Sequence, residues 1–277
     1  MNAAARAPLE ELATPLADAR EPALARWSRP STRIVRIASL VITLAAWEIL
    51  GREANPILMS YPSAIAIALV DLLGSGKLVE ALVVSGQSFV LGYLIAAAVG
   101  IPLGLLMGRY RYVEATLDLY VNALYATPLI ALIPLFVLWF GLGFTVKVAV
   151  VAIMTVFPIL ISTWTGVQNA SRQLIELGRA FCADERMIVT KIIVPATIPY
   201  IVTGLRLGIG RAVIGMVMAE FFTSISGLGG IIINSANNFQ TARMFVPIVV
   251  LMVLAIGLSA LLRIAERRFA PWLELLR

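Results

Sequence analysis

Residue types that commonly carry catalysis are scarce in this chain. It has no histidine and one cysteine, Cys182, which argues against a zinc site or histidine-based catalysis and rules out an internal disulfide. The stretch GSGK at 74–77 resembles part of a phosphate-binding loop. However, Asp71 stands where that loop requires glycine, and Leu78 where it requires serine or threonine. We therefore expect no catalytic residue, no metal, no cofactor and no ATP hydrolysis by this chain itself.

Four ionisable side chains lie inside strongly apolar stretches, where charge is costly and marks a functional site by default: Glu48, Arg206, Arg211 and Glu220. On a helix, Arg206 and Arg211 would lie about 7.5 Å apart, and Glu220 about 21 Å from Arg206. The alternative for the two arginines is that they extend to the nearer end of the stretch and bind loop carbonyls. Glu220 fits a packing contact and a pathway residue equally well, and we expect Glu48 to be a buried, hydrogen-bonded acid.

The elements that carry these side chains are membrane spans. Hydrophobic residues make up 60% of the chain and charged residues 14%, and the mean hydropathy is +0.92. No soluble domain needs so much apolar surface, and runs of the roughly 20 apolar residues that cross a bilayer recur. We predict an all-α polytopic protein in the lipid bilayer, with six transmembrane helices at 34–52, 79–107, 113–140, 145–167, 198–222 and 246–265.

The distribution of basic residues predicts the orientation of these spans. Of the 22 Lys and Arg residues, sixteen lie on the side of the chain termini, four lie on the other side, and two are inside a span. The positive-inside rule then makes both termini cytoplasmic. The net charge of +6 reflects this topology and predicts no nucleic-acid binding. We expect residues 1–32 to be a flexible cytoplasmic tail, residues 33–270 the membrane domain and residues 271–277 a C-terminal tail.

Two predicted spans carry small residues at every fourth position, and a third contains prolines. The small residues are Ser88, Gly92, Ala96, Gly100, Gly104 and Gly108 in one stripe and Gly204, Gly208 and Ala212 in the other. Helices in lipid approach closely along such stripes, so we expect both stripes to pack within the chain. Pro128 and Pro134 are expected to bend the span at 113–140.

A charged stretch, ELGRAFCADERMIVTKIIVPATIPY at 176–200, interrupts the apolar runs on the cytoplasmic side. Leu174, Leu177 and Phe181 follow the spacing of one helical face. An apolar face outside the membrane that packs on nothing would be an exposed patch. We therefore expect it to dock on a partner.

A second short helix is expected within this stretch. Asp184 is placed to cap it, and Ile188 and Ile192 form its apolar face. Pro195 and Pro199 are expected to end this helix and to begin the next span, because proline is tolerated in a first turn but not inside a helix. The stretch is thus predicted to form a helix–turn–helix.

The same stretch resembles the EAA loop of the permease subunits of bacterial ABC importers, whose pattern is roughly E-A-A-x3-G-x9-I-x-L-P. Here the pattern reads Glu176-Leu177-Gly178, then Cys182, Ile192, Val194 and Pro195. The segments PYIVTGLRLGIGRAVIGMVMAEFF and ATPLIALIPLFVLWFGLG are similar to the branch that imports nitrate, sulfonates and taurine. The resemblance covers roughly residues 35–268.

This resemblance implies the type I importer permease fold and a pathway for a small solute across the bacterial inner membrane. It implies two copies of a cytoplasmic ABC ATPase subunit, an extracytoplasmic substrate-binding protein and a second permease copy. That copy makes a homodimer, and a heterodimer with a related permease stays open. The resemblance makes residues 168–197 the coupling loop, with ATPase-coupling residues Glu176, Leu177, Gly178, Phe181, Cys182, Asp184, Ile188, Ile192 and Pro195. For Glu176, a solvated charge near a helix start is the alternative.

Two departures from the family pattern occur in this loop. Leu177 and Gly178 replace a pair of alanines, which leaves the amphipathic face intact. Cys182 replaces the turn glycine. If the turn requires a positive φ, cysteine costs on the order of 1 kcal/mol there, whereas a right-handed turn carries no such cost. We otherwise expect Cys182 to be a small, buried thiol.

The translocation pathway is expected along the bent span and the outer half of 198–222. The candidate residues are Pro128, Leu132, Pro134, Arg206, Arg211, Met216 and Glu220. The outer segments 55–64 and 223–244 are expected to receive the binding protein. The alternative function is a self-sufficient channel or secondary transporter. Such proteins usually contain inverted repeats with broken helices, and the sequence contains no evident repeat.

Overall fold

The computed structural model describes residues 32–55, 57–223 and 226–269, and these residues contain helices and no strands. The helices are α1 (Thr32–Glu53), α2 (Pro62–Gly74), α3 (Lys77–Arg109), α4 (Arg111–Ala126), α5 (Ile133–Phe140), α6 (Phe144–Gln168), α7 (Arg172–Ala180), α8 (Glu185–Ile188), α9 (Val194–Thr223), α10 (Gly227–Asn237) and α11 (Thr241–Phe269), with a 3-10 helix η1 (Leu129–Leu132) and a π-helix η2 (Val189–Ile193). The chain divides into two units, residues 1–47 and 48–277. The predicted tails 1–32 and 271–277 lie almost entirely outside the described residues.

Five of the described helices are long and apolar enough to cross a membrane, and α4 with α5 makes a sixth if the pair is counted as one span. The all-α membrane architecture expected from the sequence is confirmed. The predicted span at 113–140, however, is not one helix, because α4 and the η1–α5 segment bend by 86°. Pro128 lies at the break and has no N–H to continue the helix. Pro134 lies in the first turn of α5, where no donor is needed.

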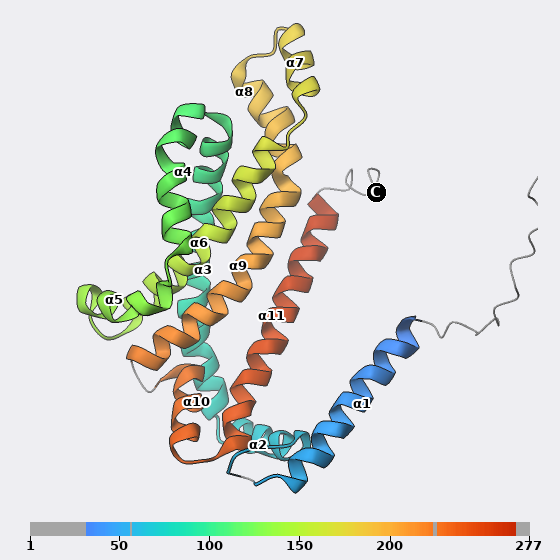
Figure 1. The fold of residues 1–277 in the computed structure, drawn as a ribbon, viewed down its shortest axis with the longest axis vertical. Helices are drawn as coiled ribbons and strands as arrows, with labels where there is room; N and C mark the ends of the chain where they lie inside the picture. The colour runs from blue at the N-terminus through green and yellow to red at the C-terminus, as the bar shows by residue number, and fades with distance from the viewer. Residues whose placement is uncertain (1–31, 56, 224–225, 270–277) are drawn as a thin grey trace, which may run out of the picture. The chain divides into compact units, whose positions relative to one another are not determined.

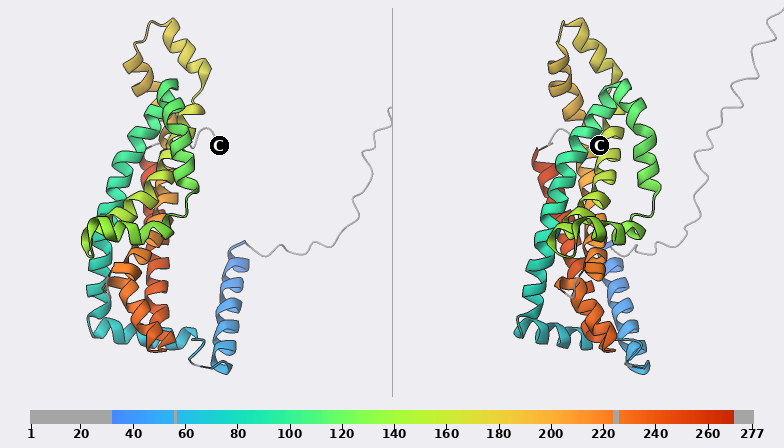
Figure 2. Two further views of the ribbon diagram at one scale, coloured as in Figure 1. Left: turned by 60° about the vertical axis from the view of Figure 1, so that its left-hand side comes forward. Right: turned by 90° about the vertical axis from the view of Figure 1, so that its left-hand side faces the viewer.

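The centre of the second unit is α6, which packs against α3 and α9 (Figures 1 and 2). The stripe on α3 packs against α6. The approach is so close that a Cβ on Gly104 would lie 2.6 Å from the Leu160 carbonyl oxygen. The shorter stripe, on α9, also packs against α6, where a Cβ on Gly204 would lie 2.8 Å from Cβ of Ser162. Both stripes therefore pack within the chain, as predicted, and they allow three spans to approach at backbone distance.

The helix that follows the charged stretch, α9, begins differently from what the sequence predicts. Pro195 and Pro199 do not end a helix, because η2 runs directly into α9 and both prolines lie inside that continuous helical segment. In η2 the hydrogen bonds are one residue longer than in an α-helix, and the Val194 N–H donates to the Val189 carbonyl. This wider turn accommodates the ring of Pro195, which in a regular α-helix would clash with the carbonyl four residues earlier.

The C-terminal end of α1 is hydrogen-bonded to the start of α2. The Glu48 carboxylate accepts hydrogen bonds from the Ser63 N–H at 3.0 Å and the Ser63 hydroxyl at 2.7 Å. Arg52, one turn along α1, donates to the same carboxylate at 2.7 Å. Glu48 is therefore hydrogen-bonded as expected, although its side chain is 24% exposed rather than buried.

Candidate functional site

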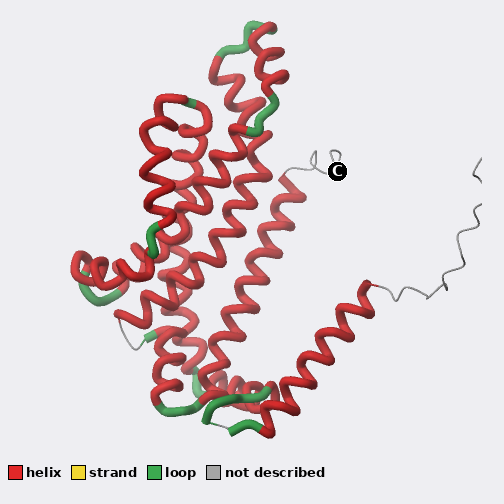
Figure 3. The backbone as a smooth tube through the Cα atoms, in the orientation of Figure 1, coloured by secondary structure: helices red, strands yellow, loops and turns green. Residues whose placement is uncertain are grey.

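The charged stretch forms a bracket, residues 171–193, which extends beyond the packed helices (Figures 1 and 3). Ser171 caps α7 by accepting a hydrogen bond from the Leu174 N–H at 3.4 Å. Asp184 caps α8 by accepting one from the Met187 N–H at 2.8 Å, the role expected from the sequence. Each cap satisfies a donor that a helix start leaves free, so the bracket keeps two separate helices.

Three apolar side chains of the bracket face outward and form what we call the ridge. Leu174 is 51% exposed, Leu177 53% and Phe181 79%. Their spacing of three and four residues places them on one side of α7 and its C-terminal end. The apolar face expected from the sequence is therefore present, and it is left uncovered by the residues that the structure describes.

The turn between α7 and α8 contains Cys182 in a left-handed conformation, with φ at 56°. Backbone hydrogen bonds close this turn, from the Cys182 N–H to the Arg179 carbonyl at 2.9 Å and from the Ala183 N–H to the Gly178 carbonyl at 3.0 Å. Of the two alternatives left by the sequence, the left-handed turn is therefore the one observed, and a residue with a Cβ is strained in it. The thiol is exposed, which corrects the expectation of a buried cysteine.

The inner side of the bracket packs on the membrane helices. Ile188 is 1% exposed and Ile193 is 3%, and both pack with Val167 near the end of α6. Ile192 is half-buried, and a Cβ on Gly178 would lie 3.0 Å from its Cδ1 atom. Ile188 therefore anchors the bracket to α6, Ile192 packs against α7 within the bracket, and neither extends the ridge.

Ion pairs also fix the bracket to the end of α3. The Glu185 carboxylate accepts a hydrogen bond from the Arg109 guanidinium, and it lies 3.6 Å from that of Arg179. The bond from Arg109 lowers the pKa of Glu185. Because Glu185 is exposed, these pairs set position more than stability. The Glu176 side chain is exposed and makes no hydrogen bond or ion pair with the described residues, which is compatible with both of its predicted roles.

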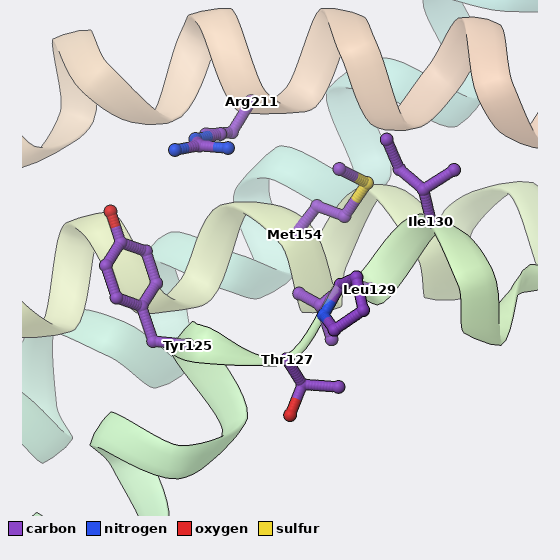
Figure 4. A pocket seen from close by; sticks show the side chains of 7 residues that line it. Tyr125, Thr127, Leu129, Ile130, Met154 and Arg211 are labelled. Carbon is purple, nitrogen blue, oxygen red and sulfur yellow. The ribbon is translucent and has the colours of Figure 1, made fainter.

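A pocket of about 160 Å³ lies where α4 passes into η1, against α6 and α9 (Figure 4). Its lining consists of Tyr125, Thr127, Pro128, Leu129, Ile130, Met154 and Arg211. Figure 4 shows the guanidinium of Arg211 and the hydroxyl of Tyr125 directed into the same space from opposite sides. The pocket therefore combines one cation, Arg211, and two hydroxyl-bearing residues, Tyr125 and Thr127, with four apolar residues.

The structure brings together only part of the predicted pathway. Pro128 and Arg211 line the pocket, and Leu132 and Pro134 lie in the η1–α5 segment that continues from it. Met216 is 2% exposed, so it belongs to the interior of the chain and does not line this pocket. Arg206 is half-buried one and a half turns earlier on α9 and does not line it either.

Glu220 lies fully buried in a polar cluster near the end of α9. Its Oε1 atom accepts a hydrogen bond from the Ser85 hydroxyl at 2.6 Å, and its Oε2 atom accepts one from the Gly229 N–H at 2.7 Å. The Lys147 ammonium, itself 4% exposed, lies 4.0 Å from Oε1. The structure thus favours the packing contact over the pathway for Glu220.

This cluster holds the start of α10. The Ser85 hydroxyl accepts a hydrogen bond from the Leu228 N–H at 2.8 Å, and Lys147 donates to the Ser226 hydroxyl at 2.9 Å. The backbone of Gly227 has φ at 79°, and a Cβ on Gly229 would lie 2.8 Å from Cβ of Glu220. Glycine is needed at both positions, the first for its conformation and the second for close approach.

A second, open hollow of about 550 Å³ lies between α2 and the connection from α10 to α11. Asp71 and Arg243 close part of it with an ion pair of 2.5 Å. Phe239 lies on its rim with 68% of its surface exposed and φ at 55°. Phe239 and Arg243 belong to the segment 223–244, for which the sequence predicts a protein partner, whereas Asp71 lies beyond the other predicted segment, 55–64. Ser60 of that other segment is buried.

Residues 100–271 match the family described as binding-protein-dependent transport system inner membrane component. The chain belongs to this family of ABC importer permeases. The permease is 30% identical over 233 residues to the aliphatic sulfonates transport permease protein SsuC of Bacillus subtilis (strain 168), covering 83% of this chain and 84% of that protein. It is 33% identical over 255 residues to the ABC transporter permease protein MJ0413 of Methanocaldococcus jannaschii, covering 88% and 94%.

A solved structure has the same fold. The permease matches a chain of the MetNI methionine ABC transporter in an inward-facing conformation with a TM-score of 0.55. The match covers 72% of this chain and 95% of that chain at 21% identity. The type I importer permease fold expected from the sequence is therefore confirmed.

Sequence reasoning missed the residues that pair with one another across these sites. Ser85 and Glu220 of the permease are 135 residues apart, and Arg109 and Glu185 are 76 apart, so no local pattern connects either pair. One signal was available for Lys147: it is a charge within the apolar run that begins at 144, and such charges are expected to be paired.

Proposed function

We propose that this permease forms the pathway by which a small organic anion of the aliphatic sulfonate class crosses the bacterial inner membrane, driven by a separate ATPase. The single observation that carries the proposal is the exposed ridge of Leu174, Leu177 and Phe181. On a loop outside the membrane, apolar side chains in such an arrangement need a protein partner. Membership in a family of ABC importer permeases favours the ATPase subunit as that partner.

The ridge supplies the anchoring contact, and the rest of the bracket holds it in place. A large aromatic side chain that becomes buried at an interface contributes far more than rim charges do, so Phe181 is the main anchor. Most of the other coupling residues position the ridge through the Asp184 cap, the tight turn and the inner packing: Gly178, Cys182, Asp184, Ile188, Ile192 and Pro195. Exposed Glu176 is proposed to contact the partner directly. The coupling loop is thus residues 168–197.

The outer hollow is the proposed docking surface for the substrate-binding protein. It is open, it lies on the side opposite to the bracket, and it exposes Phe239 beside the Asp71–Arg243 pair. A crosslinker at Asn237, which is exposed, should capture the binding protein, whereas buried Ser60 is unsuitable. Capture of another permease copy alone would assign this surface to an interface between copies.

The assembly is proposed to contain two permease copies, two ATPase subunits and one binding protein. A homodimer is the simplest closed arrangement for a pathway between subunits, and one bracket per copy gives two ATPase sites. The excess of basic residues on the side of the termini supports a cytoplasmic location for both tails, 1–32 and 271–277, which precede and follow the membrane domain at 33–270 in the sequence. The substrate class follows the name of the Bacillus subtilis relative.

Reconstitution tests this function. Liposomes containing the permease and its ATPase, supplied with the binding protein and ATP, should accumulate ethanesulfonate, and omission of any one component should abolish accumulation. Uptake that persists without the ATPase would contradict the proposal and identify a self-sufficient channel or secondary transporter. ATP-driven uptake of other solutes but not of sulfonates would overturn the substrate class alone.

A further inference from the structure

Arg211 lies deep within the membrane part of α9. Farther along α9, Glu220 accepts a hydrogen bond from Ser85 of α3, and in the other direction the Leu205 carbonyl accepts one from the Tyr93 hydroxyl at 2.8 Å. Arg211 therefore lies between the levels of Ser85 and Tyr93. At 1.5 Å per residue these levels are about 12 and 24 Å from the outer end of α3, which is within the apolar thickness of a bilayer.

The guanidinium of Arg211 has no acidic partner among the described residues. Arg211 is exposed. The buried charges near the outer half of α9, Glu220 and Lys147, instead lie close to each other. The exposed side of α9 around it carries Leu207, Gly210 and Ile214, which supply no counter-charge. A guanidinium at this depth is strongly unfavourable against lipid, so it faces water or an anion.

The pocket at Arg211 has the chemistry of a site for a small anion. A guanidinium donates through a planar fork that matches the oxygens of a sulfonate or carboxylate. The Tyr125 hydroxyl faces it across the pocket and can donate to the same group (Figure 4). Met154, Leu129 and Ile130 provide apolar walls for an alkyl part. A single cation holds an anion without trapping it, which a pathway requires.

We propose that this Arg211 pocket is an anion-binding subsite of the translocation pathway, which holds the charged group of the solute while its alkyl part contacts the apolar walls. The proposal rests on the proposed function, because the pathway must open to this face of α9. In a homodimer each copy contributes one such pocket. Arg211 acts by charge and by its hydrogen-bonding fork, so lysine should replace it partly and glutamine should not.

A reporter cysteine tests the pocket without knowledge of the substrate. We would introduce Thr127→Cys in a Cys182→Ser background and use the purified permease–ATPase complex in lipid nanodiscs. The rates of reaction with an anionic reagent, 2-sulfonatoethyl methanethiosulfonate, and with a cationic one, 2-(trimethylammonio)ethyl methanethiosulfonate, are compared. With Arg211 present the ratio of the two rates should favour the anionic reagent by about tenfold more than after Arg211→Gln. Arg211→Lys should keep most of the preference.

The reporter experiment can also overturn the proposal. A rate ratio independent of residue 211, or a reporter that is inert to both reagents in every nucleotide state, would show that the pocket is not an accessible anion site. Nanodiscs with and without phosphatidylglycerol distinguish the source of the anion. Loss of the preference only in phosphatidylglycerol would assign the pocket to a lipid head group and contradict a transport subsite.

Uptake provides the second arm. Arg211→Gln should lower ATP-driven ethanesulfonate uptake at least tenfold while the ATPase subunit still co-purifies. Arg263→Gln, at an exposed arginine of α11, is the matched control and should leave uptake unchanged. Equal uptake by Arg211→Gln and the unsubstituted protein would refute the subsite. If the unsubstituted protein takes up no sulfonate but the reporter retains its anion preference, the substrate class fails and the pocket stands.

Discussion

Glu220 anchors α10 with the two oxygens of one carboxylate. Its Oε1 bonds to Ser85, its Oε2 bonds to Gly229, and Lys147 lies close enough to share the charge. Arg211, on the same helix and also ionisable, instead lines an open pocket. The two residues carry the same signal in the sequence, a charge in an apolar run, and their opposite fates depend on which helices pack beside them.

Glu220→Ala should strongly destabilise the folded permease. The substitution leaves Lys147 buried without its carboxylate, and loss of one partner of a buried pair typically costs 3–5 kcal/mol. Unfolding by sodium dodecyl sulfate in mixed micelles measures the change, and Glu80→Ala, at an exposed acid of α3, should alter the unfolding free energy little. Equal stability of the two variants would remove Glu220 from its anchoring role.

Cys182→Gly should stabilise the bracket turn by about 1 kcal/mol, because glycine adopts a positive φ without the clash that a Cβ creates. Hydrogen exchange of the Ala183 amide, which closes the turn, reports this change as about fivefold slower exchange. Cys182→Ala retains the Cβ and should exchange at the original rate. Faster exchange in the glycine variant would mean that the turn carries no strain.

At the scale of elements, the sequence predicts contacts that depend on a repeating pattern. The four-residue stripe on α3 predicted close helix packing because small side chains on one face have few other uses in lipid. The π-helix before Pro195 was not predictable, since nothing in the local pattern separates a widened turn from a helix end. Pro128 predicted a bend, but the 86° angle depends on what α5 packs against.

Two glycine variants on α3 test whether the small-residue stripe is needed for its packing against α6. Gly104→Ala places a Cβ 2.6 Å from the Leu160 carbonyl oxygen, so it should destabilise the permease by roughly 1–3 kcal/mol. Gly86→Ala meets no atom within 4 Å and should be neutral or stabilising by up to about 1 kcal/mol. Detergent thermal unfolding of both variants compares them. A neutral Gly104→Ala would show that α3 and α6 separate more easily than their packing indicates.

At the scale of the whole molecule, α2 and the α10–α11 connection, which line the hollow, lie at the opposite end of the packed helices of the second unit from the bracket (Figures 1 and 2). The Arg211 pocket is lined by residues of α4, η1, α6 and α9. This arrangement suits a subunit that receives a solute at one end and energy at the other. The exposed apolar face of the bracket was predictable from the sequence, because its three- and four-residue spacing is a local pattern. The sequence could not place Tyr125 and Arg211 around one pocket, since their positions depend on how α4 and α9 pack beside α6.

The most direct measurement of the central claim is retention of the ATPase subunit by a bracket variant. Phe181→Ala removes a largely exposed aromatic side chain outside every span, so membrane insertion should be unaffected. If Phe181 is the docking anchor, its loss should weaken ATPase binding by about 2 kcal/mol or more per site and abolish ATP-driven uptake. Phe239→Ala, at an exposed aromatic residue beside the hollow at the other end of the helices, should retain the ATPase, as should Arg186→Ala, on the flank of the bracket. Full co-purification of the ATPase with Phe181→Ala, together with full uptake, would contradict the account and leave the bracket as a loop with no role in coupling.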